Sequence, residues 1–362
     1  MNTKPIDAIA NAVLYEGYML YPYRPSSVKN RQRFNFGVLY PKSYSETTGS
    51  DPWSLQTELL VEGAAHTTLQ VSVRFLKMVD RSAQKVTEPT PQFFSSVSLE
   101  PERKVPAAWQ EAVECDVAVL PFDLGALEAA PLQSEFAFPA KEDSDPRRDA
   151  EGRLLETIVR KQESLYGVVE VAATRVADGI VKVQVRVKNQ TAFQDAARDD
   201  LGRDDFATES GRDLALMRSL VSAHVRLGVT DGQFVSLLEP PETLRDLAAS
   251  CQNIGAWPVL VGTAGERDTM LASPIILYDY PQIAPESPGD LFDGTEIDEI
   301  LALRIMTLTD DEKSEMRDSD DRARKILERT ETLPMEHLMK LHGTLREMRR
   351  ELRPSISGEE MP

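Results

Sequence analysis

The stretch VVEVAATRVADGIVKVQVRVK, residues 168–188, decides the fold class of this chain. From Val181 to Val187 every second residue is valine, and the residues between them are lysine, glutamine and arginine. This period of two is typical of a strand with one buried face. Asp178-Gly179 precedes this run and suits the positive φ angles of a tight turn. The stretch therefore predicts a β-hairpin.

The same period extends on the N-terminal side of the hairpin, from about residue 55. Residues 69–75 and residues 113–117 both alternate apolar and polar side chains. Several strands at this spacing favour a β-sandwich or two small sheets, and the pattern does not separate these options.

Beyond residue 200 the pattern becomes mixed. Residues 221–227 alternate, and Asp231-Gly232 offers a second turn with 234–238 as the returning strand. Apolar residues at helical spacing follow between 244 and 251, and capping signals begin at Thr295 and Thr309. A last helix is expected from about 333 to 352. The sequence thus predicts an α+β protein with a β-sandwich-like N-terminal region, a mixed α/β middle and a helical C-terminal part.

Two charged stretches, residues 141–151 and 195–205, interrupt the pattern and are typical of solvated linkers or helix faces. Leu154, Leu155 and Ile158 are spaced for a short helix. We expect a domain boundary near residue 200. The expected organisation is a β-rich domain at 1–200, a mixed α/β domain ending in helices at 201–353 and a frayed tail at 354–362.

The chain of 362 residues has 41 Lys and Arg against 59 Asp and Glu, a net charge of −18. This balance argues against nucleic acid as a general partner. Residues 1–50 instead carry a local charge of +3, which leaves −21 on the remainder. No apolar run exceeds four residues, so membrane insertion is not expected. The N-terminus lacks the regions of a secretory signal, and we expect a cytoplasmic protein.

The segment from residue 9 to residue 44 contains six of the nine tyrosines, interleaved with basic residues. Tyrosine and arginine are enriched at binding hot spots, so we predict a partner-binding surface here. Its candidate residues are Tyr15, Tyr18, Tyr21, Tyr23, Arg24, Lys29, Arg31 and Arg33. An equally weighted alternative is that the tyrosines brace the end of a β-domain.

Residues 279–295, DYPQIAPESPGDLFDGT, form a proline-rich and acidic loop. Carboxylates in a loop suit a hard cation such as Ca²⁺ or Mg²⁺. The candidate ligands are Asp279, Glu286, Asp290 and Asp293. The acids do not alternate before a glycine as the calcium-loop template requires, so helix capping and a stiff loop are the favoured interpretation.

Histidines give little further evidence for catalysis. His337 and His342 lie five residues apart, about 140° around a helix, and cannot share a ligand face. His224 lies on the polar side of its expected strand, where we predict a surface or hydrogen-bonded residue and keep a catalytic base as the less favoured alternative. Phosphate-loop, dinucleotide-binding and nucleophile-elbow motifs are absent from the sequence, and no cofactor is predicted.

Three strings carry a resemblance to a known family. They are IANAVLYEGYMLYPYR (9–24), KNRQRFNFGVLYP (29–41) and SPIILYDYPQIAPESPGDLFDGTEIDEIL (273–301). The chain resembles, over most of its length, a family of uncharacterised bacterial proteins encoded beside uptake nickel–iron hydrogenase genes. This resemblance implies a protein partner, the hydrogenase or its maturation machinery, and implies no catalytic residue.

Two hypotheses about function follow. The first is a non-enzymatic accessory or protein-interaction protein, linked to hydrogenase maturation or assembly. The alternative is a metal-dependent hydrolase or transferase that uses the acidic loop at 279–299, which requires the acids to converge with a basic or histidine partner.

Overall fold

The computed structural model describes residues 3–14, 37–85, 109–149, 151–193, 209–282, 305–319 and 321–332. Within these residues one sheet of ten strands dominates, and all pairings between its strands are antiparallel. The helices of the described chain are short. The expected α+β organisation, with a β-sandwich-like region, a mixed middle and a helical C-terminal part, is therefore wrong. Local periodicity identifies strands but does not encode which distant strands pair.

Strand β1 (Ser54–Lys85) is the centre of the sheet because its 32 residues pair with other strands along both edges. One edge pairs first with β7 (Ile180–Asn189) and then with β2 (Trp109–Asp123). The other edge pairs first with β8 (Val221–Val235) and then with β5 (Leu154–Gln162). One long strand thus joins segments from both halves of the sequence.

The predicted hairpin of residues 168–188 is confirmed. Strand β6 (Leu165–Ala177) pairs with β7, and the turn between them contains Gly179 at φ +69°. Strand β3 (Leu132–Phe138) adds to the other edge of β6. The alternating valines of β7 point into the core, as their period predicts.

The expected second hairpin at Asp231-Gly232 is absent, because β8 continues through these residues. Asp231 has φ +57° and faces a register shift in β1 between Gly63 and Thr68. The Thr67 hydroxyl donates a hydrogen bond to the Asp231 carbonyl at 2.7 Å. A Cβ at position 232 would lie 2.6 Å from the Thr67 side chain, so only glycine fits here. The Asp-Gly pair therefore bends two paired strands and does not reverse the chain.

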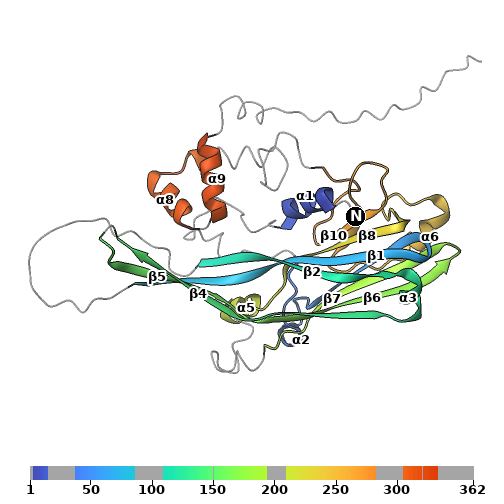
Figure 1. Cartoon of the computed structure of the whole chain (residues 1–362), viewed down its shortest axis with the longest axis horizontal. Coiled ribbons are helices and arrows are strands. Elements are labelled where there is room, and N and C mark those ends of the chain that lie inside the picture. Colours follow the sequence, from blue (N-terminus) through green and yellow to red (C-terminus); the bar gives the residue numbers. More distant parts are fainter. Residues whose placement is uncertain are drawn as a thin grey trace, which may run out of the picture.

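The sheet continues from β8 to β10 (Thr269–Ser273) and ends at β9 (Trp257–Leu260). Figure 1 shows β6 and β7 running below β1 and β8. Side chains from these strands, including Phe75, Val185 and Val225, belong to one buried cluster. Strands from both sides of the expected boundary near residue 200 thus share one sheet and one core.

Short helices cover parts of the sheet. Helix α1 (Thr3–Leu14) packs on β10 and β9, and its Asp7 forms an ion pair with Arg226 of β8 at 2.6 Å. Thr309 and Glu312 make reciprocal side-chain to backbone bonds at the start of the helix that begins at Asp310, as the capping signal predicts. The other helical segments are α2 (Lys42–Thr48), α3 (Leu124–Ala129), α5 (Glu209–Leu216), η2 (Glu242–Leu244), α6 (Arg245–Ala249), α8 (Asp310–Ser319) and α9 (Asp321–Thr332). The expected helix at 333–352 lies outside the described residues.

Strand β4 (Lys141–Arg148) replaces the linker or helix face expected for residues 141–151. It pairs with β5, where a short helix was expected, and all eight of its residues are exposed. Figure 1 shows the two strands at the left end of the molecule. The charges and Pro146 of β4 fit an outer strand, because both disfavour pairing with a further chain. None of the described helices is long and apolar enough to cross a membrane.

Candidate functional site

Of the six N-terminal tyrosines, Tyr40 and Tyr44 lie in the core, and the other four lie outside the residues that the structure describes. Tyr40 and Tyr44 are 2% and 3% exposed and pack with Phe193. Burial raises the pKa of Tyr40 to about 12, although Arg212 donates a hydrogen bond to its hydroxyl at 3.1 Å. These two rings brace the fold. The partner-binding candidates Tyr15, Tyr18, Tyr21, Tyr23, Arg24, Lys29, Arg31 and Arg33 lie outside the described residues and stay a prediction.

Asp279 is the one described member of the expected acidic loop site. One of its carboxylate oxygens accepts a hydrogen bond from the Leu260 backbone N–H at 2.7 Å, and the other accepts from the Ser236 hydroxyl at 2.5 Å. Both carboxylate oxygens therefore make hydrogen bonds that stabilise the fold. Glu286, Asp290 and Asp293 lie outside the described residues. Across the described ranges, no three His, Cys, Asp or Glu side chains are grouped to hold a metal ion.

His224 is hydrogen-bonded, which is one of the two expected alternatives, but it is buried within the sheet rather than on its surface. Its Nδ1 lies 2.7 Å from the Ser222 carbonyl, and its Nε2 lies 3.2 Å from the hydroxyl of Ser273 on β10. A serine beside a histidine has the composition of a nucleophile and its base. Both side chains are 0% exposed, however, so no substrate reaches them in this conformation. Burial lowers the pKa of His224 to about 4 and keeps the ring neutral at pH 7.

Residues 274–280, hereafter the 274–280 segment, hold two apolar side chains in solvent. Ile276 and Tyr278 are 74% and 86% exposed, whereas Leu277 between them packs towards α1 and the end strands. Asp279 ties the segment to Ser236, which directly follows β8, and to Leu260 of β9 through the bonds described above. Tyr280 ties it again, with its backbone N–H donating to the Leu260 carbonyl and its hydroxyl to the Glu266 carbonyl. The segment therefore presents Ile276 and Tyr278 from an anchored backbone.

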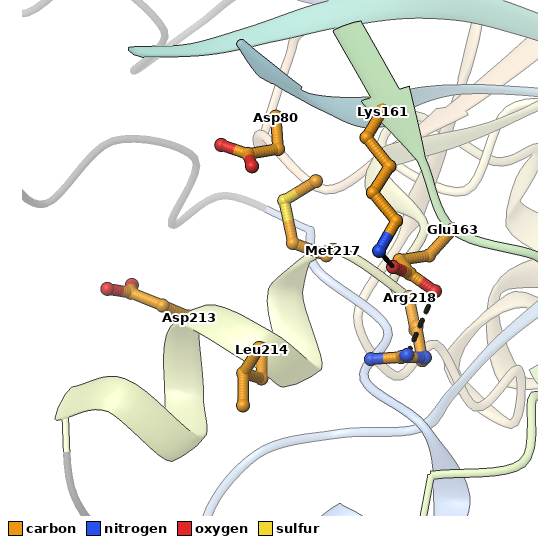
Figure 2. A pocket seen from close by; sticks show the side chains of 7 residues that line it. All are labelled: Asp80, Lys161, Glu163, Asp213, Leu214, Met217 and Arg218. Atoms are coloured by element: carbon orange, nitrogen blue, oxygen red, sulfur yellow. Dashed lines mark hydrogen bonds and ion pairs between the residues drawn. The ribbon is translucent and has the colours of Figure 1, made fainter. Parts of the chain in front are cut away.

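A cavity of about 270 Å³ lies between β1, β5 and α5. Figure 2 shows the charged side chains on its lining, with Leu214 and Met217 as the apolar part. Glu163 forms ion pairs with Lys161 at 3.3 Å and with Arg218 at 2.9 Å. The Asp80 carboxylate points away from this group in Figure 2. The cavity thus combines acidic, basic and apolar walls.

Sequence reasoning missed both of these features. The cavity residues come from segments as distant as residues 80 and 218, and no motif connects them. A signal for the 274–280 segment did exist, because apolar residues at 276 and 278 precede an Asp and a Pro-rich run. Of residues 273–278, the structure places only Ser273 in a strand.

No protein-family model matches this chain, and no curated protein sequence matches it.

Proposed function

We propose that the protein is a cytoplasmic, non-enzymatic accessory protein that binds a protein partner through the 274–280 segment. The observation that supports this proposal is the exposure of Ile276 and Tyr278 on a backbone anchored at Asp279 and Tyr280. Anchoring lowers the conformational entropy that the segment would lose on binding. A tyrosine with few rotatable bonds is also among the residue types enriched at binding hot spots.

The energies involved are sufficient for recognition. Burying a large apolar side chain contributes roughly 1.5–3 kcal/mol. Ile276 and Tyr278 have most of this free energy available, because their side chains contact little of the protein. Burying two such side chains therefore accounts for a large change in affinity, because about 1.4 kcal/mol corresponds to a tenfold change in the dissociation constant.

The resemblance of residues 273–301 to proteins encoded beside uptake nickel–iron hydrogenase genes suggests which partner to test. The exposed pair lies within that string. We therefore propose the hydrogenase, or a protein of its maturation machinery, as the partner. The basic N-terminal segment with Tyr21 and Arg24 is a second candidate for the same contact.

The test is co-purification of the tagged protein with hydrogenase subunits and maturation proteins from bacteria that express the uptake hydrogenase genes. Ile276→Ser with Tyr278→Ala is expected to weaken capture by about tenfold or more, because truncated hot-spot side chains cost about 1–2 kcal/mol or more. Tyr21→Ala with Arg24→Ala is expected to act in the same direction. The melting temperature of the 276/278 variant should match that of the wild type, because the truncated side chains are exposed.

The matched control is Leu120→Ser, because Leu120 is 83% exposed and lies on β2 rather than in the 274–280 segment. It should leave capture unchanged. The proposal is contradicted if the wild type retains no hydrogenase-related protein. It is contradicted equally if the Leu120 variant and the 276/278 variant lose capture to the same extent.

A further inference from the structure

Asp80 and Lys161 face each other across β1 and β5 but do not pair. They are direct partners in the antiparallel register of these strands. Opposite charges in such positions have Cβ atoms about 4.5–5.5 Å apart and usually interact. Lys161 instead contacts Glu163 at 3.3 Å, and Asp80 makes no ion pair or hydrogen bond within the described residues. Complementary charges are thus held apart at the wall of the cavity.

The basic side of the cavity has unused hydrogen-bond donors. Arg218 carries five N–H donors, and its side chain makes one hydrogen bond with the described residues, from Nη2 to Glu163. Its side chain is only 12% exposed, so water reaches it from few directions. The Lys161 ammonium has three donors and lies near one carboxylate. This side therefore has the capacity to bind a carboxylate.

The acidic side has the complementary capacity. Asp80 lines the cavity with a carboxylate that is open to a further donor. Asp213 of α5 lines the same side of the cavity and has a contact of its own. In Figure 2 these two carboxylates lie to the left of Met217, and Lys161, Glu163 and Arg218 lie to its right. An ammonium group of a ligand is a donor that suits the open Asp80 carboxylate.

The size and the apolar wall limit the ligand further. At about 270 Å³ the cavity is just below the range of roughly 300–1,000 Å³ that is typical of drug-sized sites. Leu214 and Met217 offer contact to an aliphatic group. Asp80 and Lys161 are direct neighbours across β1 and β5. The ammonium and the carboxylate of a ligand that binds both residues should therefore also be close together.

From these observations we infer that the cavity binds a free α-amino acid with an aliphatic side chain. Its ammonium group lies at Asp80, its carboxylate at Lys161 and Arg218, and its side chain against Leu214 and Met217. Such a ligand gives Asp80 and Lys161 each a partner of opposite charge at the same time. This site is separate from the 274–280 segment, and the inference does not depend on the proposed partner.

The test is titration of the full chain with L-norleucine, followed by calorimetry or ligand-observed NMR. Three comparison compounds separate the contributions: hexylamine lacks the carboxylate, hexanoate lacks the ammonium, and 6-aminohexanoate carries its charges at opposite ends. L-Norleucine is expected to bind saturably and about tenfold or more tightly than each of the three, since each lost charge-assisted contact costs about 1.5–3 kcal/mol.

Two variants test the geometry. Asp80→Asn and Lys161→Met are each expected to weaken L-norleucine binding by about tenfold or more. Glu239→Gln removes one exposed acidic charge away from the cavity lining and should leave binding unchanged. Thermal unfolding checks that each variant is folded, which we expect because Asp80→Asn is close to isosteric and the Lys161 side chain is 55% exposed.

Three results would overturn the inference. The first is the absence of saturable binding of L-norleucine to the wild type. The second is binding of hexylamine or 6-aminohexanoate as tight as that of L-norleucine, which would indicate a simple cation site or charges set far apart. The third is an Asp80→Asn variant, folded as judged by its melting curve, that binds L-norleucine as tightly as the wild type.

Discussion

His224 shows how a single residue acquires properties that its sequence position does not reveal. Its neighbours Ser222 and Arg226 are polar, which led us to expect a polar strand face. In the structure β10 lies beside β8 in the sheet, the ring is fully buried, and Ser273 of β10 donates to its Nε2. Because the Ser222 carbonyl can only accept, Nδ1 carries the ring hydrogen. The residue is thus a neutral hydrogen-bonding link between β8 and β10.

This burial makes His224 a source of acid sensitivity. Burial, and to a smaller extent Arg74, lowers its pKa from 6.5 to about 4 in the folded protein. As the pH falls from about 6.5 to 4, the unfolded chain takes up a proton at His224 before the folded chain does. The stability contribution is therefore complete above about pH 6.5, and about 3 kcal/mol is lost as the pH falls to 4.

Urea unfolding of the wild type and of His224→Gln, measured between pH 7.5 and 4, checks this prediction. Glutamine does not titrate, so the difference in unfolding free energy between the two proteins should shift in favour of the variant as the pH falls. Carboxylates titrate in both proteins and cancel in the difference. A difference that stays constant with pH would show that His224 is not buried as a neutral ring.

At the scale of elements, the sequence predicted strands well where one face is buried. The β6–β7 hairpin followed directly from alternating valines and from Asp178-Gly179. Strand β4 could not be predicted in this way, because all of its residues are exposed and no alternation exists. Asp231-Gly232 has the same letters as a hairpin turn, but Thr67 of a strand 164 residues away converts it into a bend. Turn residues specify a local φ and leave the path of the chain to tertiary contacts.

The anchoring of the 274–280 segment by Asp279 leads to a prediction for this element. Asp279→Ala is expected to lower the free energy of unfolding by about 1–3 kcal/mol, because the Leu260 N–H and the Ser236 hydroxyl lose their acceptor. Urea unfolding measures the loss, and amide exchange at Leu260 should become faster. Glu239→Ala, which removes an exposed carboxylate from the loop that follows β8, should have little effect.

The same experiment separates a structural Asp279 from a metal ligand. Mg²⁺ or Ca²⁺ should leave the melting temperature of both the wild type and the Asp279 variant unchanged. A cation that stabilises the wild type and not the variant would instead favour the acidic loop at 279–299 as a metal site, because a ligand that binds only the folded state raises its stability.

At the scale of the whole molecule, the candidate sites depend on contacts that cross the sequence. Asp80 and Lys161 face the same cavity because β5 pairs with the far end of β1, and Arg218 joins them after α5. No spacing rule within the sequence connects these three positions. The sequence identified residues 273–301 through their resemblance to a known family. The exposure of Ile276 and Tyr278, in contrast, is visible only in the folded structure.

The topology also predicts how the molecule unfolds. Residues 1–200 were expected to form a domain. Strand β8 lies beyond residue 200, however, and it pairs with much of one edge of β1. A chain ending at residue 200 would expose that edge and remove Val225 and Leu227 from the core, so we expect it to lack a cooperative unfolding transition. The full chain should unfold in one calorimetric transition with equal calorimetric and van't Hoff enthalpies, because strands from both sides of residue 200 share one core. Two separate transitions, or a 1–200 fragment that melts cooperatively, would show that the sheet divides where the charge pattern suggested.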